Sequence, residues 1–318
     1  MPKLGRKVLV TGGAGFIGSH VCDAFNAAGW AATALDDLSS GKKENLSEAA
    51  RLVVADIRSP EAADLVRTGG FDVVCHHAAQ IDVRVSVDRP DHDADINIMG
   101  LLNLLEAAVA GEVRRFVFVS SGGVVYGEPE DLPIGELAPK QPLSPYGVSK
   151  LTGEHYLHFY RQIHGLEGVS LRYSNVFGPR QDPHGEAGVV AIFGRSVLED
   201  RPLTVYGDGE QTRDYVYVGD VAQANLLAAE LDISGSETMD DVAFNVGTGT
   251  ETSVNELARA VMRVAGKEVP VERRPARPGE LQRSCLDSGK LQDLGWQPAG
   301  DLDAGLASTY RWIVGGGR

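Results

Sequence analysis

Positive charge, cysteine and long apolar runs are all scarce in this chain of 318 residues. Lys and Arg number 30 against 44 Asp and Glu, so the formal net charge at pH 7 is −14. A protein this acidic repels polyanions, which argues against a general role in coating nucleic acid or an anionic membrane. The three cysteines, Cys22, Cys75 and Cys285, are far apart and form neither a disulfide framework nor a metal-ligand spacing. We therefore expect no bound metal.

Apolar runs of the length that a membrane requires are absent from the sequence. None reaches the roughly 20 residues of a spanning helix, and the apolar run near the N-terminus is too short for a signal peptide. Hydrophobic residues nevertheless make up 43% of the chain, which is enough for a sizeable core. These features predict a globular, cytoplasmic protein with reduced cysteines, of roughly two domains or one large one.

Short β-branched runs alternate with longer helical patterns in the first half of the chain. We expect strands at 7–10, 30–35, 51–55, 72–75, 115–119 and 169–173, and helices at 15–28, 95–110 and 146–164. This alternation predicts an α/β fold, a Rossmann-type doubly wound parallel sheet with helices on both faces. We expect this domain to span 1–175 and to be completed by a segment near 215–247. Loop signals increase afterwards, and helical patterns at 187–198, 254–265 and 302–313 predict a smaller mixed α/β domain at 176–318.

Glycine, by contrast, is abundant, with 38 residues, and the stretch TGGAGFIG joins the first expected strand to the first helix. Gly12, Gly15 and Gly18 there permit a tight turn, close approach to a pyrophosphate and close helix–strand packing. The helix N-terminus would direct its N–H groups at the phosphates. Asp36 ends the second strand, where a carboxylate accepts hydrogen bonds from ribose hydroxyls and repels the 2′-phosphate of NADP. The pattern predicts an NAD site, with a ligand-free glycine turn as the alternative.

A tyrosine and a lysine four residues apart, Tyr146 and Lys150, lie on one face of the helix expected after the fifth strand. A lysine ammonium near a phenol favours the phenolate and lowers the pKa of the phenol, which gives a base usable near neutral pH. In isolation this spacing would indicate a surface pair. Its position in a dinucleotide fold favours catalysis.

Eight stretches extend this pattern across 11–280: TGGAGFIGSH, LDDLSSG, HHAAQ, VSSGGVVYGEP, SPYGVSK, LRYSNVFGPR, QTRDYVYVGDV and RPARPGE. With them the chain resembles the extended short-chain dehydrogenase/reductase family, and within it the UDP-glucose 4-epimerases. The resemblance implies a tightly bound NAD that is regenerated in each cycle. Tyr146 would take the proton of the sugar 4′-OH while hydride leaves C4′, and Lys150 would hold the nicotinamide ribose. The 4-keto sugar would then turn, and hydride would return to its other face.

The resemblance also implies which residues surround the two ligands. NAD would be bound by Gly12, Gly15, Phe16, Ile17, Gly18, Asp36, Asp37, Ser40, Gly41, Asp56, Ile57, His77, Ala78, Ala79, Gln80, Asn97, Ser120, Tyr146, Lys150 and Tyr173. The UDP-sugar would be bound by Ser121, Gly122, Tyr146, Asn175, Gly188, Val189, Tyr206, Arg213, Arg277, Glu280 and Ser284. For Arg213, an ion pair with Asp214 or another acid is the alternative.

Two positions depart from the family pattern. The usual Ser or Thr four residues before the tyrosine of VYG is replaced by Gly122, so Ser121 or water would hydrogen-bond the 4′-OH. The position where a bulky tyrosine restricts the sugar pocket in some members is Ser284, which predicts that N-acetylated UDP-hexoses fit. The alternative for Ser284 is a loop residue away from the pocket.

Several other functions share parts of these motifs. A dTDP-glucose 4,6-dehydratase would need Asp-Glu where this chain has Gly123-Val124, which counts against that enzyme. A UDP-glucuronate 4-epimerase remains the main rival, with a UDP-glucuronate decarboxylase behind it, because Arg84, Arg180 and Arg195 could meet a carboxylate. A regulatory NAD-binding protein would be the non-enzymatic alternative. The family also implies a homodimer formed by the helices around 95–110 and 146–164.

Overall fold

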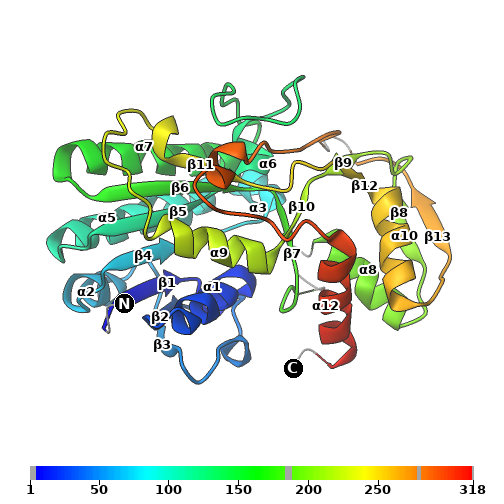
Figure 1. Ribbon diagram of the computed structural model, residues 1–318, viewed down its shortest axis with the longest axis horizontal. Coiled ribbons are helices and arrows are strands. Elements are labelled where there is room, and N and C mark those ends of the chain that lie inside the picture. Colours follow the sequence, from blue (N-terminus) through cyan, green and yellow to red (C-terminus); the bar gives the residue numbers. More distant parts are fainter. Residues whose placement is uncertain (1–4, 183–187, 278–280, 317–318) are drawn as a thin grey trace. The chain divides into compact units, whose positions relative to one another are not determined.

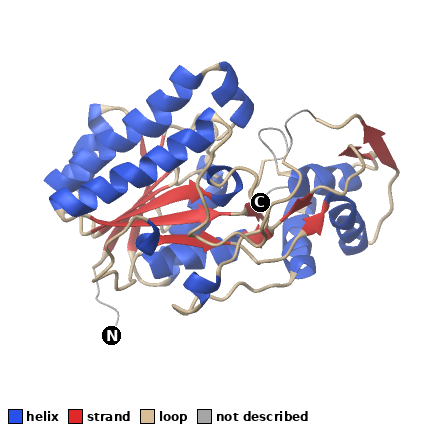
Figure 2. Ribbon diagram, turned by 90° about the horizontal axis from the view of Figure 1, so that it is seen from above, coloured by secondary structure: helices blue, strands red, loops and turns tan. Residues whose placement is uncertain are grey.

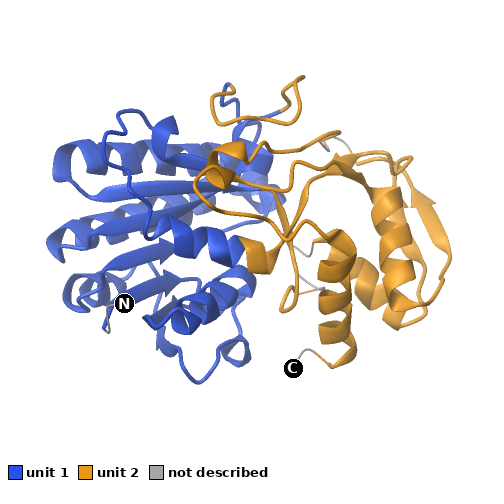
Figure 3. Cartoon of the chain, viewed as in Figure 1, with its two compact units in different colours: residues 1–127, 139–173, 221–244 blue, residues 128–138, 174–220, 245–318 orange. Residues whose placement is uncertain are grey.

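The computed structural model of the chain describes residues 5–182, 188–277 and 281–316. The chain forms two compact units (Figure 3). Unit 1 comprises Met1–Gly127, Pro139–Tyr173 and Val221–Phe244, and unit 2 comprises Glu128–Ala138, Ser174–Asp220 and Asn245–Arg318.

The unit boundaries differ from the expected domain limits in two respects. The segment that returns to unit 1 is Val221–Phe244, shorter than the 215–247 that we expected. The segment Glu128–Ala138 lies in unit 2, although it falls within the expected first domain. The physical reason is pairing across a long sequence distance, since Ile134 forms a β-bridge with Leu286 and its carbonyl accepts a hydrogen bond from Asn245 Nδ2.

Unit 1 is built on a seven-stranded sheet of order β11-β6-β5-β4-β1-β2-β3 (Figure 1). The strands β1 to β6 belong wholly to this unit. The strands are β1 (Lys7–Thr11), β2 (Ala31–Asp36), β3 (Arg51–Val54), β4 (Val73–His76), β5 (Arg115–Ser121), β6 (Glu167–Tyr173) and β11 (Ala243–Val246), the last of which continues into unit 2. Neighbours from β3 to β6 pair in parallel. Because their apolar side chains point to both faces, both faces require covering helices.

Helices lie on both sides of the strands (Figure 2). Unit 1 contains α1 (Phe16–Ala27), α2 (Pro60–Thr68), α3 (Val83–Asp88), α4 (Pro90–Ala94), α5 (Gly100–Ala110), α6 (Gly122–Val125), α7 (Pro145–His164) and most of α9 (Val218–Ala228), with the short turns η1 (Lys43–Asn45), η2 (Asp95–Met99) and η3 (Asp240–Val242). One core cluster joins Leu9, Val74 and Phe116 of the strands to Leu104 of α5 and Leu157 of α7. This packing confirms the predicted Rossmann-type sheet.

The helix expected at 95–110 is helical throughout, but its first turn is a π-helix. Residues Asp95–Met99 form η2, and α5 follows directly from Gly100. A single turn of π-helix inside a helix is rare and is frequently associated with a functional site. The apolar spacing of the sequence gave no sign of it, since the π-turn lies at the start of the expected helix and most of the apolar positions follow it in α5.

Unit 2 has short strands and three longer helices. Its elements are β7 (Asn175–Phe177), β8 (Leu203–Tyr206), β9 (Thr212–Arg213), β10 (Tyr215–Tyr217), β12 (Thr252–Ser253), β13 (Val271–Arg274), α8 (Val189–Leu198), α10 (Val254–Ala265), α11 (Gly289–Gln292) and α12 (Leu302–Val314). A capping box starts α10, where Ser253 Oγ accepts the Glu256 N–H at 3.1 Å and the Glu256 carboxylate accepts the Ser253 N–H at 2.8 Å.

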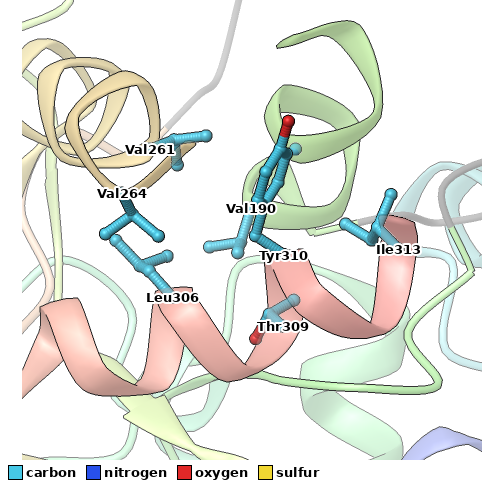
Figure 4. Close-up of a pocket in the computed structure, with 8 residues that line it drawn as sticks. Val190, Val261, Val264, Leu306, Thr309, Tyr310 and Ile313 are labelled. Atoms are coloured by element: carbon cyan, nitrogen blue, oxygen red, sulfur yellow. The ribbon is translucent and has the colours of Figure 1, made fainter. Parts of the chain in front are cut away.

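The apolar faces of α8, α10 and α12 form the core of unit 2. One small pocket between these three helices is lined by Val190, Val261, Leu306 and Ile313 (Figure 4). The void that they leave is about 10 Å³, which is at the lower limit of the space that one water molecule needs. The three helices therefore pack closely against one another. In the part of the chain that the structure describes, no helix is long and apolar enough to cross a bilayer.

Candidate active site

The loop between β1 and α1 is shaped by glycines that leave no room for side chains. Gly12 has φ +64°, and a Cβ atom there would lie 2.8 Å from the main-chain nitrogen of Ala78. A Cβ atom on Gly18 would lie 2.2 Å from the Gly12 oxygen. Gly15 is the N-cap of α1, and because it has no side chain it does not itself cap the N–H groups of the first turn. The N–H groups of the first turn, which includes Phe16 and Ile17, are therefore suited to a phosphate.

The carboxylate of Asp36 ends β2 beside this loop. It is 7% exposed and accepts the N–H groups of Ala14 and Leu38, both at 2.9 Å. Burial raises the pKa of this carboxyl group, and the main-chain hydrogen bonds oppose the rise. A Cβ atom on Gly41 would lie 2.6 Å from Asp36 Oδ1, so the glycine leaves one side of the carboxylate open. This cradle fits a ribose diol and, with the glycine loop, fits the dinucleotide that the motifs predicted.

Two neighbours of this cradle are engaged within the protein. Asp37 accepts the Ser39 N–H at 2.9 Å, so its carboxylate stabilises its own turn. Ser40 and Gly41 continue the same loop. The Asp56 carboxylate forms an ion pair with Arg58, whose hydrogen bond lowers the pKa of Asp56. The side chain of Ile57 is buried in the core of unit 1, so only its main chain is available to a ligand.

The segment after β4 carries the expected histidine and small residues. His76 is buried, and its Nδ1 atom lies 2.8 Å from Thr11 Oγ1, which also accepts the Ala78 N–H. Burial lowers the pKa of His77 to about 3, so its ring is neutral. Both ring nitrogens of His77 are buried. Ala78 and Ala79 follow as small residues, as a close cofactor approach requires.

The predicted catalytic pair lies at the start of α7. Ser144 caps this helix, since its Oγ accepts the Gly147 N–H at 3.1 Å, and Pro145 occupies the first helical position. Lys150 Nζ donates to the Val119 carbonyl of β5 at 2.9 Å and lies 5.6 Å from the centre of the Tyr146 ring. The pair is therefore brought together at the carboxyl end of β5, where ligands of such folds bind.

The expected lowering of the tyrosine pKa is wrong for the protein alone. Burial raises the pKa of the Tyr146 phenol, and the negative charge of Asp93 adds to the rise. Burial also lowers the pKa of Lys150 to about 8. Sequence spacing brings the ammonium near the phenol but contains no information on desolvation, which is the larger cause of the raised pKa of Tyr146. A phenolate base therefore needs additional positive charge at this site.

The end of β5 places its two serines in different environments. Ser120 is buried, and its Oγ donates to Glu154 Oε1 at 2.5 Å. Glu154 is in turn paired with the buried Arg172, so the Ser120 hydroxyl is hydrogen-bonded to a buried ion pair. Ser121 is only partly buried, and a Cβ atom on Gly123 would lie 3.8 Å from its Oγ. Ser121 thus remains the candidate for the 4′-OH in place of Gly122, which is buried at the start of α6.

The remaining cofactor candidates are held by side-chain hydrogen bonds. Asn97 Oδ1 accepts the Gln80 N–H at 2.8 Å, and Asn97 Nδ2 donates to the Gln80 carbonyl at 2.9 Å. Tyr173 is buried, and its hydroxyl accepts a hydrogen bond from Asn225 Nδ2 at 2.5 Å. Burial raises the pKa of Tyr173, so this phenol is neutral.

The uridine-side candidates all belong to unit 2. The guanidinium of Arg277 stacks on Tyr206, with its carbon 3.8 Å from the ring centre. Arg213 Nη1 donates to the Thr212 carbonyl at 2.7 Å. Asp214, which the sequence offered as a partner for Arg213, is fully buried and accepts hydrogen bonds from Thr248 Oγ1 at 2.6 Å and from the Thr248 N–H at 2.8 Å.

Other candidates of unit 2 differ widely in exposure. Asn175 is exposed on β7, and its N–H donates to the Asp214 carbonyl at 2.9 Å. Gly188 is the N-cap of α8 and Val189 its first residue. Ser284 is 2% exposed. Glu280 lies outside the described residues.

Sequence reasoning missed two buried groups that contact this site. Asp93 accepts a hydrogen bond from Ser149, which lies between Tyr146 and Lys150, the predicted catalytic pair. Glu154 and Arg172 form an ion pair beneath β5 and β6 with both side chains fully buried. An acidic residue in a helical segment gives no sequence signal of burial, so only the tertiary structure could reveal either group.

Comparisons with known proteins agree with this geometry. The model of the NAD dependent epimerase/dehydratase family matches residues 8–247. The UDP-glucose 4-epimerase of Mycolicibacterium smegmatis is 45% identical over 313 residues, which cover 96% of this chain and 98% of the relative. The crystal structure of the Thermotoga maritima UDP-glucose 4-epimerase with UDP-glucose has a TM-score of 0.91 at 43% identity, covering 98% of this chain and 99% of that one.

The Thermus thermophilus UDP-glucose 4-epimerase, solved in complex with NAD, is also similar to this chain. It has a TM-score of 0.90 at 45% identity and covers 97% of this chain and 99% of its own. The resemblance that the motifs carried is confirmed by both kinds of comparison. The chain belongs to the NAD dependent epimerase/dehydratase family.

Proposed function

We propose that this chain is an NAD-dependent UDP-sugar 4-epimerase that interconverts UDP-glucose and UDP-galactose. The observation that carries the proposal is the pairing of Tyr146 and Lys150 at the end of β5, in the same unit as the glycine loop and the Asp36 cradle. A protein that only bound the dinucleotide would have no use for a buried tyrosine and lysine at this place. The names of the similar proteins support the same activity.

One proton and one hydride, each removed and then returned, account for the chemistry. The Tyr146 oxygen takes the proton of the sugar 4′-OH as the C4′–H bond breaks and a carbonyl forms at C4′. When bound, NAD would accept the hydride from C4′ and later return it, and its oxidised form would add positive charge. After the keto sugar has turned, Tyr146 returns the proton to the 4′-oxygen as hydride is delivered to the opposite face of C4′. Lys150 would hold the ribose of the cofactor, and its charge favours the phenolate.

The nucleotide must stay bound while the hexose turns. For this we propose the stacked Arg277 and Tyr206, together with Arg213, as the residues that hold uridine and diphosphate. Arginine suits this role because its planar group binds phosphate with two hydrogen bonds and stacks on rings. The start of α8 at Gly188 and Val189 would add main-chain N–H groups for the same diphosphate.

A panel of UDP-sugars tests the function directly. With the NAD-loaded protein, UDP-galactose should yield UDP-glucose, identified by the product stereochemistry in NMR spectra. UDP-N-acetylglucosamine should also be converted, since the small Ser284 stands where other family members carry a bulky tyrosine. Conversion of UDP-glucuronate alone would instead assign the 4-epimerase or decarboxylase of that sugar. If no UDP-sugar changes, the chain is a binding protein and the proposal is wrong.

We also propose that two chains associate through the helices around α5 and α7. These helices carry large apolar side chains on their outer surface, with Met99 56%, Val148 49%, Phe159 48% and Ile163 65% exposed. Exposed apolar patches of this kind mark protein–protein contacts. Sedimentation velocity should give the mass of a dimer for the wild type. A Phe159→Glu variant should give a monomer, and a monomeric wild type would contradict the proposal.

A further inference from the structure

A fully buried carboxylate, Asp93, lies in α4 beside the catalytic helix. Its Oδ2 accepts the hydroxyl of Ser149 at 2.5 Å. Its Oδ1 accepts Asn97 Nδ2 and Gln80 Nε2, both at 3.0 Å. All three donors belong to neutral side chains. Burying a carboxylate costs free energy even when it is hydrogen-bonded, which points to a role beyond packing.

The three donors come from three different elements. Ser149 belongs to α7, Asn97 to the π-helix η2, and Gln80 to the segment after β4. Asn97 also clamps the main chain of Gln80 through both its amide atoms. Asp93 therefore connects the segment expected to line the cofactor with the turn of α7 that carries the catalytic pair.

The charge of Asp93 acts on both catalytic side chains. It raises the pKa of Lys150 against the larger effect of burial, which lowers that pKa to about 8. Burial raises the pKa of Tyr146, and the charge of Asp93 raises it further. The Lys150 ammonium also lies near His76 of β4 and His77 just after it, and because burial lowers the pKa of both histidines, both rings are neutral. The negative charge at this place thus comes from Asp93.

We propose that Asp93 is a positioning residue for the catalytic pair, which it holds through Ser149 and through the attraction between its carboxylate and the Lys150 ammonium. The hydrogen bond of Ser149 to Asp93 fixes the position of this turn of α7. The next residue, Lys150, is thereby placed where its Nζ atom reaches the Val119 carbonyl. The effect of Asp93 on turnover rests on the epimerase function proposed above. Its effect on the titration of Lys150 does not depend on that function.

An Asp93→Asn variant tests the charge while keeping the volume of the side chain. Without the carboxylate, the Lys150 ammonium loses an attractive negative charge and deprotonates at lower pH. The Tyr146 phenolate loses a repulsive negative charge, so it also forms at lower pH. Both limbs of the profile of kcat/KM against pH should therefore move to lower pH by about one unit. We expect kcat to fall about tenfold or more with little change in KM.

The titration of Lys150 gives a readout independent of turnover. Carbon-13 NMR of labelled lysine side chains, assigned with a Lys150→Met variant, should show the pKa of Lys150 about one unit lower in Asp93→Asn. The matched control is Asp95→Asn, which removes a negative charge two residues away. Asp95 pairs with Arg58, and its side chain is 53% exposed. This control should retain the wild-type titration and kcat.

Ser149→Ala separates the hydrogen bond from the charge. This variant keeps the Asp93 carboxylate, so kcat should fall several-fold while the pKa of Lys150 stays at its wild-type value. Wild-type kcat and an unshifted Lys150 in a folded Asp93→Asn protein would overturn the proposal. If Asp93→Asn does not fold, an unchanged kcat in Ser149→Ala overturns it. A wild-type protein that converts no UDP-sugar disproves the proposed function, and the Lys150 titration then still decides the role of Asp93.

Discussion

Replacing Tyr146 by phenylalanine should reduce kcat for the interconversion of UDP-galactose and UDP-glucose at least about a hundredfold. The substitution removes one oxygen, the atom that takes and returns the proton of the 4′-OH. The ring remains next to Lys150, whose ammonium lies 5.6 Å from its centre, so the packing of α7 is preserved. The glycine loop and the Asp36 cradle lie on other elements. The NAD content of the purified variant should therefore equal that of the wild type.

The matched control for this prediction is Tyr156→Phe, which removes a phenol oxygen from another tyrosine of the same helix. Tyr156 packs partly buried against the core of unit 1, so its oxygen has no part in the proposed chemistry. This variant should retain wild-type turnover. Full activity of Tyr146→Phe would refute the assignment of the base. Loss of both activity and NAD would instead show that the substitution disturbs the cofactor site.

Replacing Arg172 by methionine should lower the free energy of unfolding by about 3–5 kcal/mol. Arg172 is fully buried on β6 and donates to Glu154 from Nη2 at 2.6 Å and from Nε at 3.0 Å. It also donates to the Tyr126 hydroxyl at 2.9 Å and to Asp240 at 2.8 Å. Methionine fills most of the volume but leaves the buried Glu154 without its cation. Urea denaturation monitored by circular dichroism measures the loss.

Two further variants identify the cause of this loss. Arg263→Met breaks the ion pair with Asp303, whose side chains are 60% and 46% exposed, and should change stability by less than about 1 kcal/mol. The double variant Arg172→Met/Glu154→Gln removes the isolated charge and should recover part of the stability. If the double variant is no more stable than Arg172→Met, the unpaired carboxylate is not the source of the effect.

The ion pair and the active site share a strand, which links stability to catalysis. Ser120 donates to Glu154, and the next residue, Ser121, is the candidate for contact with the 4′-OH. Successive residues of a strand point to opposite faces, so the buried pair anchors the face of β5 that Ser120 occupies, while Ser121 lies on the other face. The buried charges thus fix the position of the strand end at which the proposed chemistry occurs.

The overall negative charge of the chain is compatible with two anionic ligands. One diphosphate would rest on the main-chain N–H groups at the start of α1, where no lysine or arginine is required. The other would rely on Arg213 and Arg277 of unit 2. A net charge of −14 argues against polyanion partners at the surface, whereas a few arginines and one helix start can still bind a small anion locally.

The sequence by itself determined the sheet and the identity of the proposed reacting groups. Period and spacing predicted the strands from β1 to β6, the glycine loop, and the four-residue separation of Tyr146 and Lys150, because these are local properties of the chain. The predicted cofactor agreed with the shape of the Asp36 cradle, since the glycines that form it are visible in the sequence.

Only the tertiary structure decided the electrostatics of the site. The pKa of Tyr146 is raised, whereas the spacing alone predicted that it would fall. The cause is burial, because all the elements packed around the phenol keep water from its charged form. The roles of Asp93 and of the Glu154–Arg172 pair, and the membership of Glu128–Ala138 in unit 2, likewise depend on contacts between residues far apart in the chain. Desolvation and long-range pairing follow from the packing of all elements together, so no local pattern of residues contains them.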